Sequence, residues 1–328
     1  MAFIITGLVP GKGLAIIFCG GKCAAVRALA SWPTYALFET PVTPQNTNPT
    51  QWAQNRYGQQ ILIDPNDFIG RKVLRNGVYD HETLDFLESL FGVMKPRVIL
   101  DVGANIGNHT LMFSRYATQV LAFEPGQKAF GMLQQNVQAN GLGHVTALNY
   151  GLSESNSQQT LYVETSSNLG ESSLTLANLT SSDYVEDLIQ LRVGDEAVVE
   201  QQVDAVDFIK IDVEGHEQSV IRGLRASIAR CRPVILMEWE MEKGWLLGEV
   251  KQPDVLVDYE FFPLIWNTSW EYWKGKRLGW ARRLWVRAFG HKQRVPCPLA
   301  VSANFGRVSD VLLVPREKLG WAERFVYR

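Results

Sequence analysis

A glycine-bracketed turn that begins with an acid is the segment of this sequence best suited to bind a ligand. Residues 98–107 read VILDVGANIG. The first three suit a strand that is buried on both faces of a parallel sheet, and Asp101 follows them. Gly103 and Gly107 permit a tight turn and a close approach of the backbone to a ligand. With the helix expected at 107–116, this strand and turn predict a site for a nucleotide-type ligand.

The spacing of the turn excludes the common phosphate-binding loops. A dinucleotide-binding GxGxxG motif would need glycine where the chain has Asn105 and Asn108. No Lys-Ser or Lys-Thr pair follows the glycines, as it would in a P-loop. Asp101 is instead suited to neutralise an amine or a sulfonium. S-adenosylmethionine is a ligand of that kind.

A second acid stands roughly one strand–helix–strand step, ~20 residues, further along the chain. Residues 119–125, QVLAFEP, form another short apolar run that leads to Glu124. A carboxylate in this position can accept hydrogen bonds from both hydroxyls of a ribose. Either acid alone has an alternative interpretation as a helix cap or turn carboxylate. Two acids at this spacing around a glycine turn favour the ligand.

Four segments together resemble the FkbM-type S-adenosylmethionine-dependent methyltransferases. They are DVGANIGNHT (101–110), AFEP (122–125), NVQANGL (136–142) and FIKIDVEGHE (208–217), with LIDPNDFIG (62–70) and GVYD (77–80) as a lead-in. The resemblance covers about residues 60–240. The family more often has Glu at the position of Asp80 and a small residue at that of His216.

The resemblance and the strand ends together predict the residues that contact S-adenosylmethionine. They are Tyr79, Asp101, Gly103, Ala104, Asn105, Gly107, Asn108, Thr110, Glu124, Pro125, Gly151, Leu152 and Asp212.

Residues 208–217 carry a second cluster of ionisable side chains, where an apolar strand turns into a helix. Methyl transfer to a hydroxyl needs an in-line approach and benefits from a group that accepts the proton. Asp212, Glu214 and His216 are the candidate catalytic residues, and His216 has the more suitable ordinary pKa for a base. The alternative is that Glu214 or Glu217 only interacts with the N-terminus of the following helix.

A metal site is a second interpretation of the acids at these strand ends. Asp212 follows one expected strand, and Glu238 and Glu240 follow the next, so their oxygens could converge on Mg²⁺. Proximity and orientation alone can supply much of the catalysis, so we expect no metal as the simpler case. The five histidines show no ligand spacing, and His109 is expected to cap or pack locally.

Alternating strands and helices predict an α/β fold: a doubly wound, mostly parallel, Rossmann-like sheet of the class I methyltransferase type. Strands are expected at 60–63, 98–100, 119–123, 145–150, 159–163, 208–211, 234–238, 261–266 and 311–314, and helices at 81–92, 107–116, 127–140 and 215–230. Ligands bind such sheets at the carboxyl ends of the strands, so one crevice should collect Asp101, Glu124, residues 149–152 and Asp212.

The core is expected to be flanked by additional segments. Residues 1–57 read as an N-terminal extension, with a small strand at 14–19 and a Pro-, Asn- and Thr-rich linker at 41–57. Residues 58–266 form the methyltransferase core, 267–308 a basic aromatic insertion or cap, and 309–328 the final strand and tail. The tract at 168–174 either lines the acceptor side or is a solvated loop.

The segment after residue 266 is rich in Trp, Lys and Arg. Residues 278–289 have the spacing of a basic amphipathic helix. Such a helix could cover the acceptor site, dock on an anionic membrane or grip an acidic glycan. The alternative, with equal weight, is an ordinary helix that packs its aromatic stripe on the sheet.

Composition agrees with a cytoplasmic enzyme. The 328 residues are 46% hydrophobic with a net charge of −2, enough for a large core and without a global electrostatic partner. Four scattered cysteines read as reduced thiols. The apolar N-terminus is too interrupted for a membrane span and lacks the features of a secretory signal. Residues 270–294 leave open a peripheral contact with the inner face of a membrane.

We therefore expect an S-adenosylmethionine-dependent methyltransferase that acts on a hydroxyl oxygen. The resemblance implies a small-molecule or glycan acceptor: a sugar, glycolipid, polysaccharide or polyketide-type compound. Two alternatives remain open. Basic and aromatic residues interleave at 270–294 as in a nucleic-acid methyltransferase, although no recognised nucleic-acid-binding motif supports this. A non-catalytic binding module that retains the fold is the other.

Overall fold

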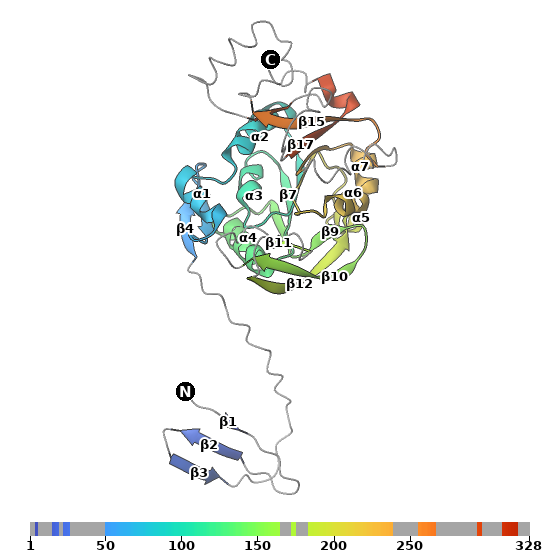
Figure 1. Cartoon of the computed structure of the whole chain (residues 1–328). Coiled ribbons are helices and arrows are strands. Elements are labelled where there is room, and N and C mark those ends of the chain that lie inside the picture. Colours follow the sequence, from blue (N-terminus) through green and yellow to red (C-terminus); the bar gives the residue numbers. More distant parts are fainter. Residues whose placement is uncertain are drawn as a thin grey trace. The chain divides into compact units, whose positions relative to one another are not determined.

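The computed structural model divides the chain into two compact units, Met1–Thr47 and Asn48–Arg328. It describes residues 4–5, 15–19, 22–26, 50–164, 172–174, 183–238, 255–266, 294–296 and 310–320 (Figure 1). In the first unit β1 (Ile4–Ile5), β2 (Ala15–Cys19) and β3 (Lys22–Val26) form an antiparallel sheet in that order. The small strand expected at 14–19 is therefore confirmed as β2.

The second unit is built on an eight-stranded sheet with the order β16-β15-β17-β14-β13-β6-β7-β8. Its strands are β6 (Val98–Val102), β7 (Gln119–Phe123), β8 (Val145–Leu148), β13 (Phe208–Ile211), β14 (Val234–Glu238), β15 (Tyr259–Trp266), β16 (Arg294–Pro296) and β17 (Asp310–Pro315). The five strands from β14 to β8 are parallel, whereas β17, β15 and β16 are antiparallel to their neighbours. The predicted doubly wound, mostly parallel sheet is confirmed.

Helices cover both faces of this sheet because its strands are apolar on both sides. Leu100 and Ile209 pack with α5 (Gly194–Glu200), α6 (Glu217–Gly223) and α7 (Arg225–Cys231), whereas Ile99 and Phe208 pack with α2 (His81–Met94) and α3 (Asn108–Phe113). Figure 1 shows these two groups of helices on either side of the strands. Consecutive residues of one strand thus face different layers, so Asp101 and Lys210 share the α2–α3 face with Ile99 and Phe208.

Smaller elements surround this core. A second sheet has the order β11-β10-β12-β9 and consists of β9 (Gly151–Ser153), β10 (Ser157–Glu164), β11 (Ser172–Ser173) and β12 (Tyr184–Val193). Helix α4 (Gln127–Ala139) packs on β8 and β5 (Gln60–Ile63). Two further helices are α1 (Phe68–Asn76), which follows β5 in the chain, and the short η3 (Arg316–Lys318), which follows β17. Strand β12 and helix α1 are not among the elements expected from sequence.

Several boundaries differ from the prediction. The expected linker at 41–57 contains β4 (Gln51–Gln54), which pairs with β5. The strand expected at 145–150 ends at Leu148, and Gly151 begins a strand of the other sheet. The helix expected at 215–230 is two helices, α6 and α7. There a Cβ on Gly223 would lie 1.9 Å from the backbone oxygen of Ser153, so the end of α6 packs closely on β9.

Strands β15 and β17 pair with each other, and most of the insertion or cap expected at 267–308 lies outside the described residues. The basic helix expected at 278–289 and most of the tract at 168–174 lie outside the described residues. Within the ranges that the structure does describe, no helix combines the length and the apolar character needed to cross a bilayer.

Candidate active site

A cavity of about 390 Å³ lies along the carboxyl ends of the parallel strands. Strands β7 and β8 lie on one side of β6, and β13 and β14 lie on the other. In a doubly wound sheet this reversal of strand order opens a crevice at the strand ends, where ligands bind. The predicted residues that line the cavity are Tyr79, Gly103, Ala104, Asn105, Asn108, Glu124, Pro125, Gly151, Leu152, Asp212, Glu214, His216 and Glu238.

The turn after β6 is held in place by its neighbours on both sides. The amides of Gly103 and Ala104 both donate to the backbone oxygen of Phe123, at 3.0 Å each. Gly103 has φ of 80°, and a Cβ there would lie 1.8 Å from the backbone oxygen of Asp212. Because that atom is backbone, only glycine fits between β7 and β13 at this point.

Gly107 is the N-cap of α3 and does not line the cavity. It has φ of 92°, and a Cβ on it would lie 2.7 Å from Cδ1 of Leu133 in α4. Glycine at this position permits the positive φ and leaves room for Leu133 of α4 beside the start of α3. Asn105, between the two glycines, has φ of 51° and does line the cavity.

Glu124 lines the cavity at the end of β7, as the sequence predicted. Its Oε2 accepts from the amide of Asn105 and its Oε1 from the amide of Gly126, both at 2.8 Å. The residue is only 8% exposed. Burial raises the pKa of Glu124 to about 7, against the effect of the two amide donors. Each oxygen keeps a second lone pair with which to accept a ligand hydroxyl.

Apolar side chains form the cavity wall next to Glu124. They come from the end of β7 and from the second sheet: Pro125, Leu152, Leu161, Ile189 and Leu191. A Cβ on Gly151 would lie 2.7 Å from Cδ2 of Leu191, so the backbone of β9 approaches this wall closely. The carboxylate and the wall together suit a ligand with a hydroxylated polar part and a flat apolar part.

Asp101 and Thr110 do not line the cavity. Asp101 is 0% exposed, and its Oδ2 accepts from Oγ1 of Thr110 at 2.6 Å. Its neighbour in the register between β6 and β13 is Lys210, whose Nζ lies 3.9 Å from Oδ1. Burial raises the pKa of Asp101, and Lys210 opposes this effect. Asp101, which was predicted to contact the cofactor, thus contacts Thr110 of α3 and Lys210 and does not reach the cavity itself.

Lys210 is a charged cavity residue that was not predicted from the sequence. It is 5% exposed on β13 and lines the cavity. Its Nζ lies 3.0 Å from Oδ2 of Asp212. Burial lowers the pKa of the lysine, but Asp212 and Asp101 outweigh it and the pKa lies above its ordinary value. A charged residue inside the apolar strand FIKI was the available sequence signal.

Asp212, Glu214 and Glu238 bring three carboxylates together at the ends of β13 and β14. One oxygen of each lies within 4.8 Å of the others. Burial, together with Asp212 and Glu214, raises the pKa of Glu238 to about 10. Burial opposes ionisation of Asp212, but Lys210 outweighs it and lowers the pKa of that carboxyl. Glu240, the third acid of the predicted metal set, lies outside the described residues.

The two histidines both border the cavity, and His109 also packs locally, as expected, with its ring centroid 6.0 Å from that of Phe113. His216 lines the cavity, but its Nε2 is 3.0 Å from Oγ of Ser153, and burial lowers its pKa. His109, which was expected to cap or pack, also lines the cavity. Burial lowers the pKa of His109 to about 3, so its imidazole is neutral. Glu217 accepts from the amide of Gly215 at 2.9 Å, just before the start of α6.

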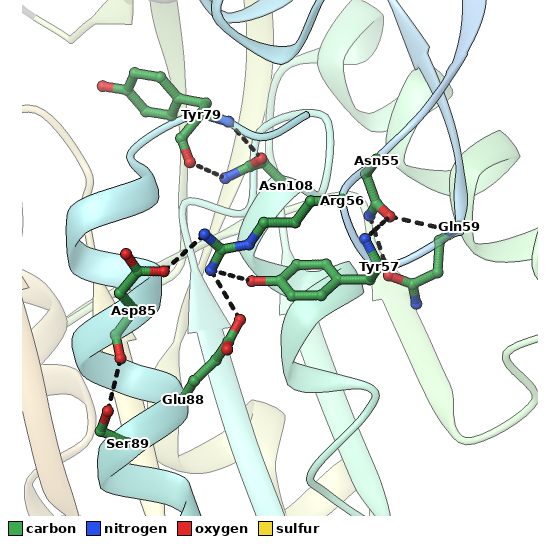
Figure 2. A network of polar contacts seen from close by, with 9 residues as sticks. All are labelled: Asn55, Arg56, Tyr57, Gln59, Tyr79, Asp85, Glu88, Ser89 and Asn108. Atoms are coloured by element: carbon green, nitrogen blue, oxygen red, sulfur yellow. Dashed lines mark hydrogen bonds and ion pairs between the residues drawn. The ribbon is translucent and has the colours of Figure 1, made fainter. Parts of the chain in front are cut away.

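The loop before α2 closes the α3 side of the cavity. Figure 2 shows Asn108, which accepts from the amide of Tyr79 and donates to its backbone oxygen, both at 3.0 Å. Asp80 follows, with φ of 49° and its Oδ2 3.9 Å from Nε2 of His109. Non-glycine residues with positive φ cluster at functional sites, and Asp80, Asn105 and Glu214 all line this cavity.

An ion-pair network fixes the helix that carries this loop. In Figure 2 the guanidinium of Arg56 contacts Asp85 at 2.7 Å, Glu88 at 2.8 Å and the hydroxyl of Tyr57 at 2.7 Å. Asp85 and Glu88 lie one turn apart on α2. The segment before β5 is therefore tied to the helix whose first turn borders the cavity.

The antiparallel strands complete the cavity with residues that the sequence analysis did not single out. Asp310 of β17 is the register partner of Glu238, and Arg294 of β16 forms an ion pair with Asp310. Both line the cavity. No local sequence signal marks them, because their strands lie 56 or more residues beyond Glu238 and join the sheet out of chain order.

Comparison with known proteins shows what this chain resembles. The family model described as the methyltransferase FkbM domain matches residues 101–264, half of the 328-residue chain. The hexuronic acid methyltransferase AglP of Haloferax volcanii is 34% identical over 141 residues, which cover 42% of this chain and 54% of that protein. Methyltransferase 1 of Beauveria bassiana is 30% identical over 143 residues, which cover 38% of this chain and 57% of that protein.

The chain thus spans little more than half the length of these two curated relatives. A crystal structure of methyltransferase FkbM from Methylobacillus flagellatus KT is similar over 51% of this chain and 39% of that chain, at 20% identity and a TM-score of 0.37. The family match contains the glycine turn, Glu124 and the carboxylates at the ends of β13 and β14. The chain belongs to the FkbM methyltransferase family, and its Rossmann-like sheet is of the class I methyltransferase type.

Proposed function

We propose that this methyltransferase uses S-adenosylmethionine to methylate a hydroxyl oxygen of a sugar-like acceptor. The observation that carries the proposal is the continuity of one cavity along the strand ends. At β7 it offers Glu124 beside an apolar wall, and at β13 and β14 it offers three carboxylates beside Lys210. One end suits a nucleoside and the other a polar acceptor.

The residues at the β7 end fit the adenosine part of the cofactor. Glu124 has the free lone pairs to accept from ribose hydroxyls, and the wall of Leu and Ile side chains can cover the adenine ring. The glycine turn lets the backbone pack closely against the end of β13, since a Cβ on Gly103 would collide with Asp212. No phosphate-binding loop competes with this interpretation, because residues 103–108 lack the required glycines.

The residues at the β13 end suit the transfer step. Bound S-adenosylmethionine supplies an electrophilic methyl group on a sulfonium. In the transfer the acceptor oxygen forms a bond to the methyl carbon, the carbon–sulfur bond breaks, and S-adenosylhomocysteine and the hydroxyl proton must leave. Lys210 keeps Asp212 ionised beside the cavity, so a carboxylate is present to orient the hydroxyl and to receive its proton.

Among the predicted catalytic residues, the structure favours the carboxylates over the imidazole as the base. Nε2 of His216 is already engaged by Ser153 at 3.0 Å, and burial lowers its pKa. Asp212 and Glu214 line the cavity with oxygens directed to the same cluster. We propose that one of these carboxylates takes the proton.

A sugar-like acceptor is supported by a relative and by the chemistry of the site. The relative AglP is named as a hexuronic acid methyltransferase. Vicinal hydroxyls of a sugar match the carboxylate oxygens and the Arg294 guanidinium that line this part of the cavity.

The test is transfer of an isotope-labelled methyl group from S-adenosylmethionine to a panel of acceptors. The panel contains uronic acids, neutral sugars and an RNA oligonucleotide, and products are identified by mass spectrometry. We expect label on a hydroxyl of a sugar or uronic acid. Label on the RNA, or on a nitrogen or carbon atom, would contradict the proposed acceptor.

A further inference from the structure

We propose that Asp212, Glu214 and Glu238 form a binding site for a divalent cation at the acceptor end of the cavity. This inference deepens the proposed function, and the purpose of the cation rests on it. The cation would hold and orient the oxygen atoms of the acceptor.

The geometry of the three carboxylates suits one hard cation. One oxygen of each lies within 4.8 Å of the other two. Oxygens on opposite sides of Mg²⁺ are about 4.2 Å apart, twice the metal–oxygen distance, and those on Ca²⁺ are up to about 5 Å apart. The three oxygens therefore need only small adjustments to share a cation.

The fold holds these ligands on separate, rigid elements. Asp212 and Glu238 follow Ile211 and Met237, which are register partners on neighbouring parallel strands. Glu214 reaches the same point because its own φ is 52° and Gly215 after it has φ of 102°. Backbone in this region is uncommon for a residue such as glutamate, and it places the third carboxylate beside the other two.

The charges around the cluster are unbalanced. Six acids line the cavity among the described residues, against the two cationic side chains of Lys210 and Arg294. Lys210 divides its charge between Asp212, at 3.0 Å, and Asp101, at 3.9 Å. Arg294 pairs with Asp310. Carboxyl groups packed this closely cannot all ionise without repelling one another, and a divalent cation removes that repulsion.

A buried imidazole provides independent evidence for a ligand at this end. His109 lines the cavity, is only 7% exposed, and its Nε2 has no hydrogen-bond partner among the described residues. That nitrogen lies 3.9 Å from Oδ2 of Asp80, and the imidazole interacts electrostatically with Asp212. Buried polar atoms are normally satisfied, so an unpartnered buried nitrogen in the wall of the cavity points to a ligand there.

The donor set selects the class of cation. Three carboxylates and no thiolate favour Mg²⁺, Mn²⁺ or Ca²⁺ over softer metals. Three protein ligands leave several coordination positions for water and for oxygens of an acceptor. A sugar diol or a uronate carboxylate has oxygens of the required kind.

The test is a calorimetric titration of MgCl₂ into the full chain, repeated with MnCl₂ and electron paramagnetic resonance detection of the bound ion. No S-adenosylmethionine is present, so the result does not depend on cofactor binding. We expect saturable binding, weakened about tenfold or more by Glu238→Gln and by Glu214→Gln, since losing even a supporting contact of a ligand costs 10–100-fold. Thermal unfolding of each variant verifies that it is folded.

The matched control is Glu186→Gln, which changes an exposed glutamate on β12 that does not line the cavity. It should bind both cations as the unchanged protein does. Absence of binding at millimolar cation, or binding that both cluster variants leave unchanged, would overturn the proposal. Titration of S-adenosylmethionine in the presence of EDTA separates the two conclusions, because a failure there contradicts the proposed function and leaves the cation site standing.

Discussion

The two ends of the cavity are built in different ways. At β6 and β7 the cavity is shaped mainly by the backbone. Its features there are the glycine conformations and the amide groups, two of which donate to one carboxylate, Glu124. At β13, β14 and β17 the cavity is formed by charged side chains, several of which form ion pairs with one another. The first end should therefore be sensitive to an added atom, and the second to a changed charge.

The largest expected effect is at the backbone-built end. Gly103→Ala places a Cβ 1.8 Å from the backbone oxygen of Asp212, at a φ of 80° that disfavours alanine. Because two strands must separate to admit it, we expect the free energy of unfolding to fall by about 3–5 kcal/mol. Urea denaturation followed by circular dichroism measures this.

Gly131→Ala is the matched control, since a Cβ there meets nothing within 4 Å in the middle of α4. It should stabilise the protein by about 0.5–1 kcal/mol. Equal effects of the two substitutions would show that the close approach at Gly103 has no energetic importance.

The charge-built end should respond most strongly to loss of its lysine. Lys210→Met leaves Asp101 and Asp212 without their shared cation, and Asp101 is fully buried. Removing one partner of a buried pair costs about 3–5 kcal/mol. Thermal and urea unfolding test this against Arg222→Met, which breaks an exposed ion pair with Glu154 and should cost about 1 kcal/mol or less.

The double variant Asp101→Asn with Lys210→Met sharpens the same point. Removing the buried carboxylate should recover part of the lost stability, because less uncompensated charge remains. A double variant less stable than Lys210→Met alone would argue against charge balance as the role of the lysine.

Cofactor affinity should depend on pH through Glu124. Its pKa is raised to about 7, so the carboxylate that accepts ribose hydroxyls is lost as the pH falls through that value. The affinity for S-adenosylmethionine should be about tenfold lower at pH 6 than at pH 8. Calorimetry on the unchanged protein and on Glu124→Gln tests this, and a variant that keeps the full pH dependence would exclude Glu124 as its source.

The smallest effect is expected at His216. Its Nε2 contacts Ser153 at 3.0 Å, so the imidazole is a positioning group at the edge of the acid cluster. His216→Asn should reduce the methyl-transfer rate less than about tenfold, whereas loss of a general base costs about 10²–10⁴-fold. A rate reduced by a hundredfold or more would restore His216 as the base.

Sequence patterns predicted the strands and turns at both ends of the cavity better than the contacts of the buried charged side chains. The turn, Glu124 and strands β5, β7, β13 and β14 follow from local runs of apolar residues that end at Gly or acidic residues. The position of the Asp101 side chain could not be predicted in the same way, since its direction depends on which helix packs on that face of the sheet. There Asp101 bonds to Thr110 instead of lining the cavity.

The missed residues share a dependence on long-range pairing. Lys210 has a function only because β13 lies beside β6, which brings it opposite Asp101. Arg294 and Asp310 reach the cavity because β17 inserts between β14 and β15. Strand β12 was missed because its alternating exposed and buried residues include charged ones, as expected for a strand with one face outside the main core.

The most direct test of the account is a calorimetric titration of S-adenosylmethionine and S-adenosylhomocysteine into the unchanged protein, Glu124→Gln and Glu238→Gln, with NAD as the control ligand. If the two ends have separate tasks, both sulfur compounds bind and NAD does not. Affinity then falls about 10–100-fold in Glu124→Gln, through loss of charge-assisted hydrogen bonds, and changes little in Glu238→Gln. Absence of binding to the unchanged protein, or a larger loss in Glu238→Gln than in Glu124→Gln, would contradict the assignment of the β7 end to the cofactor.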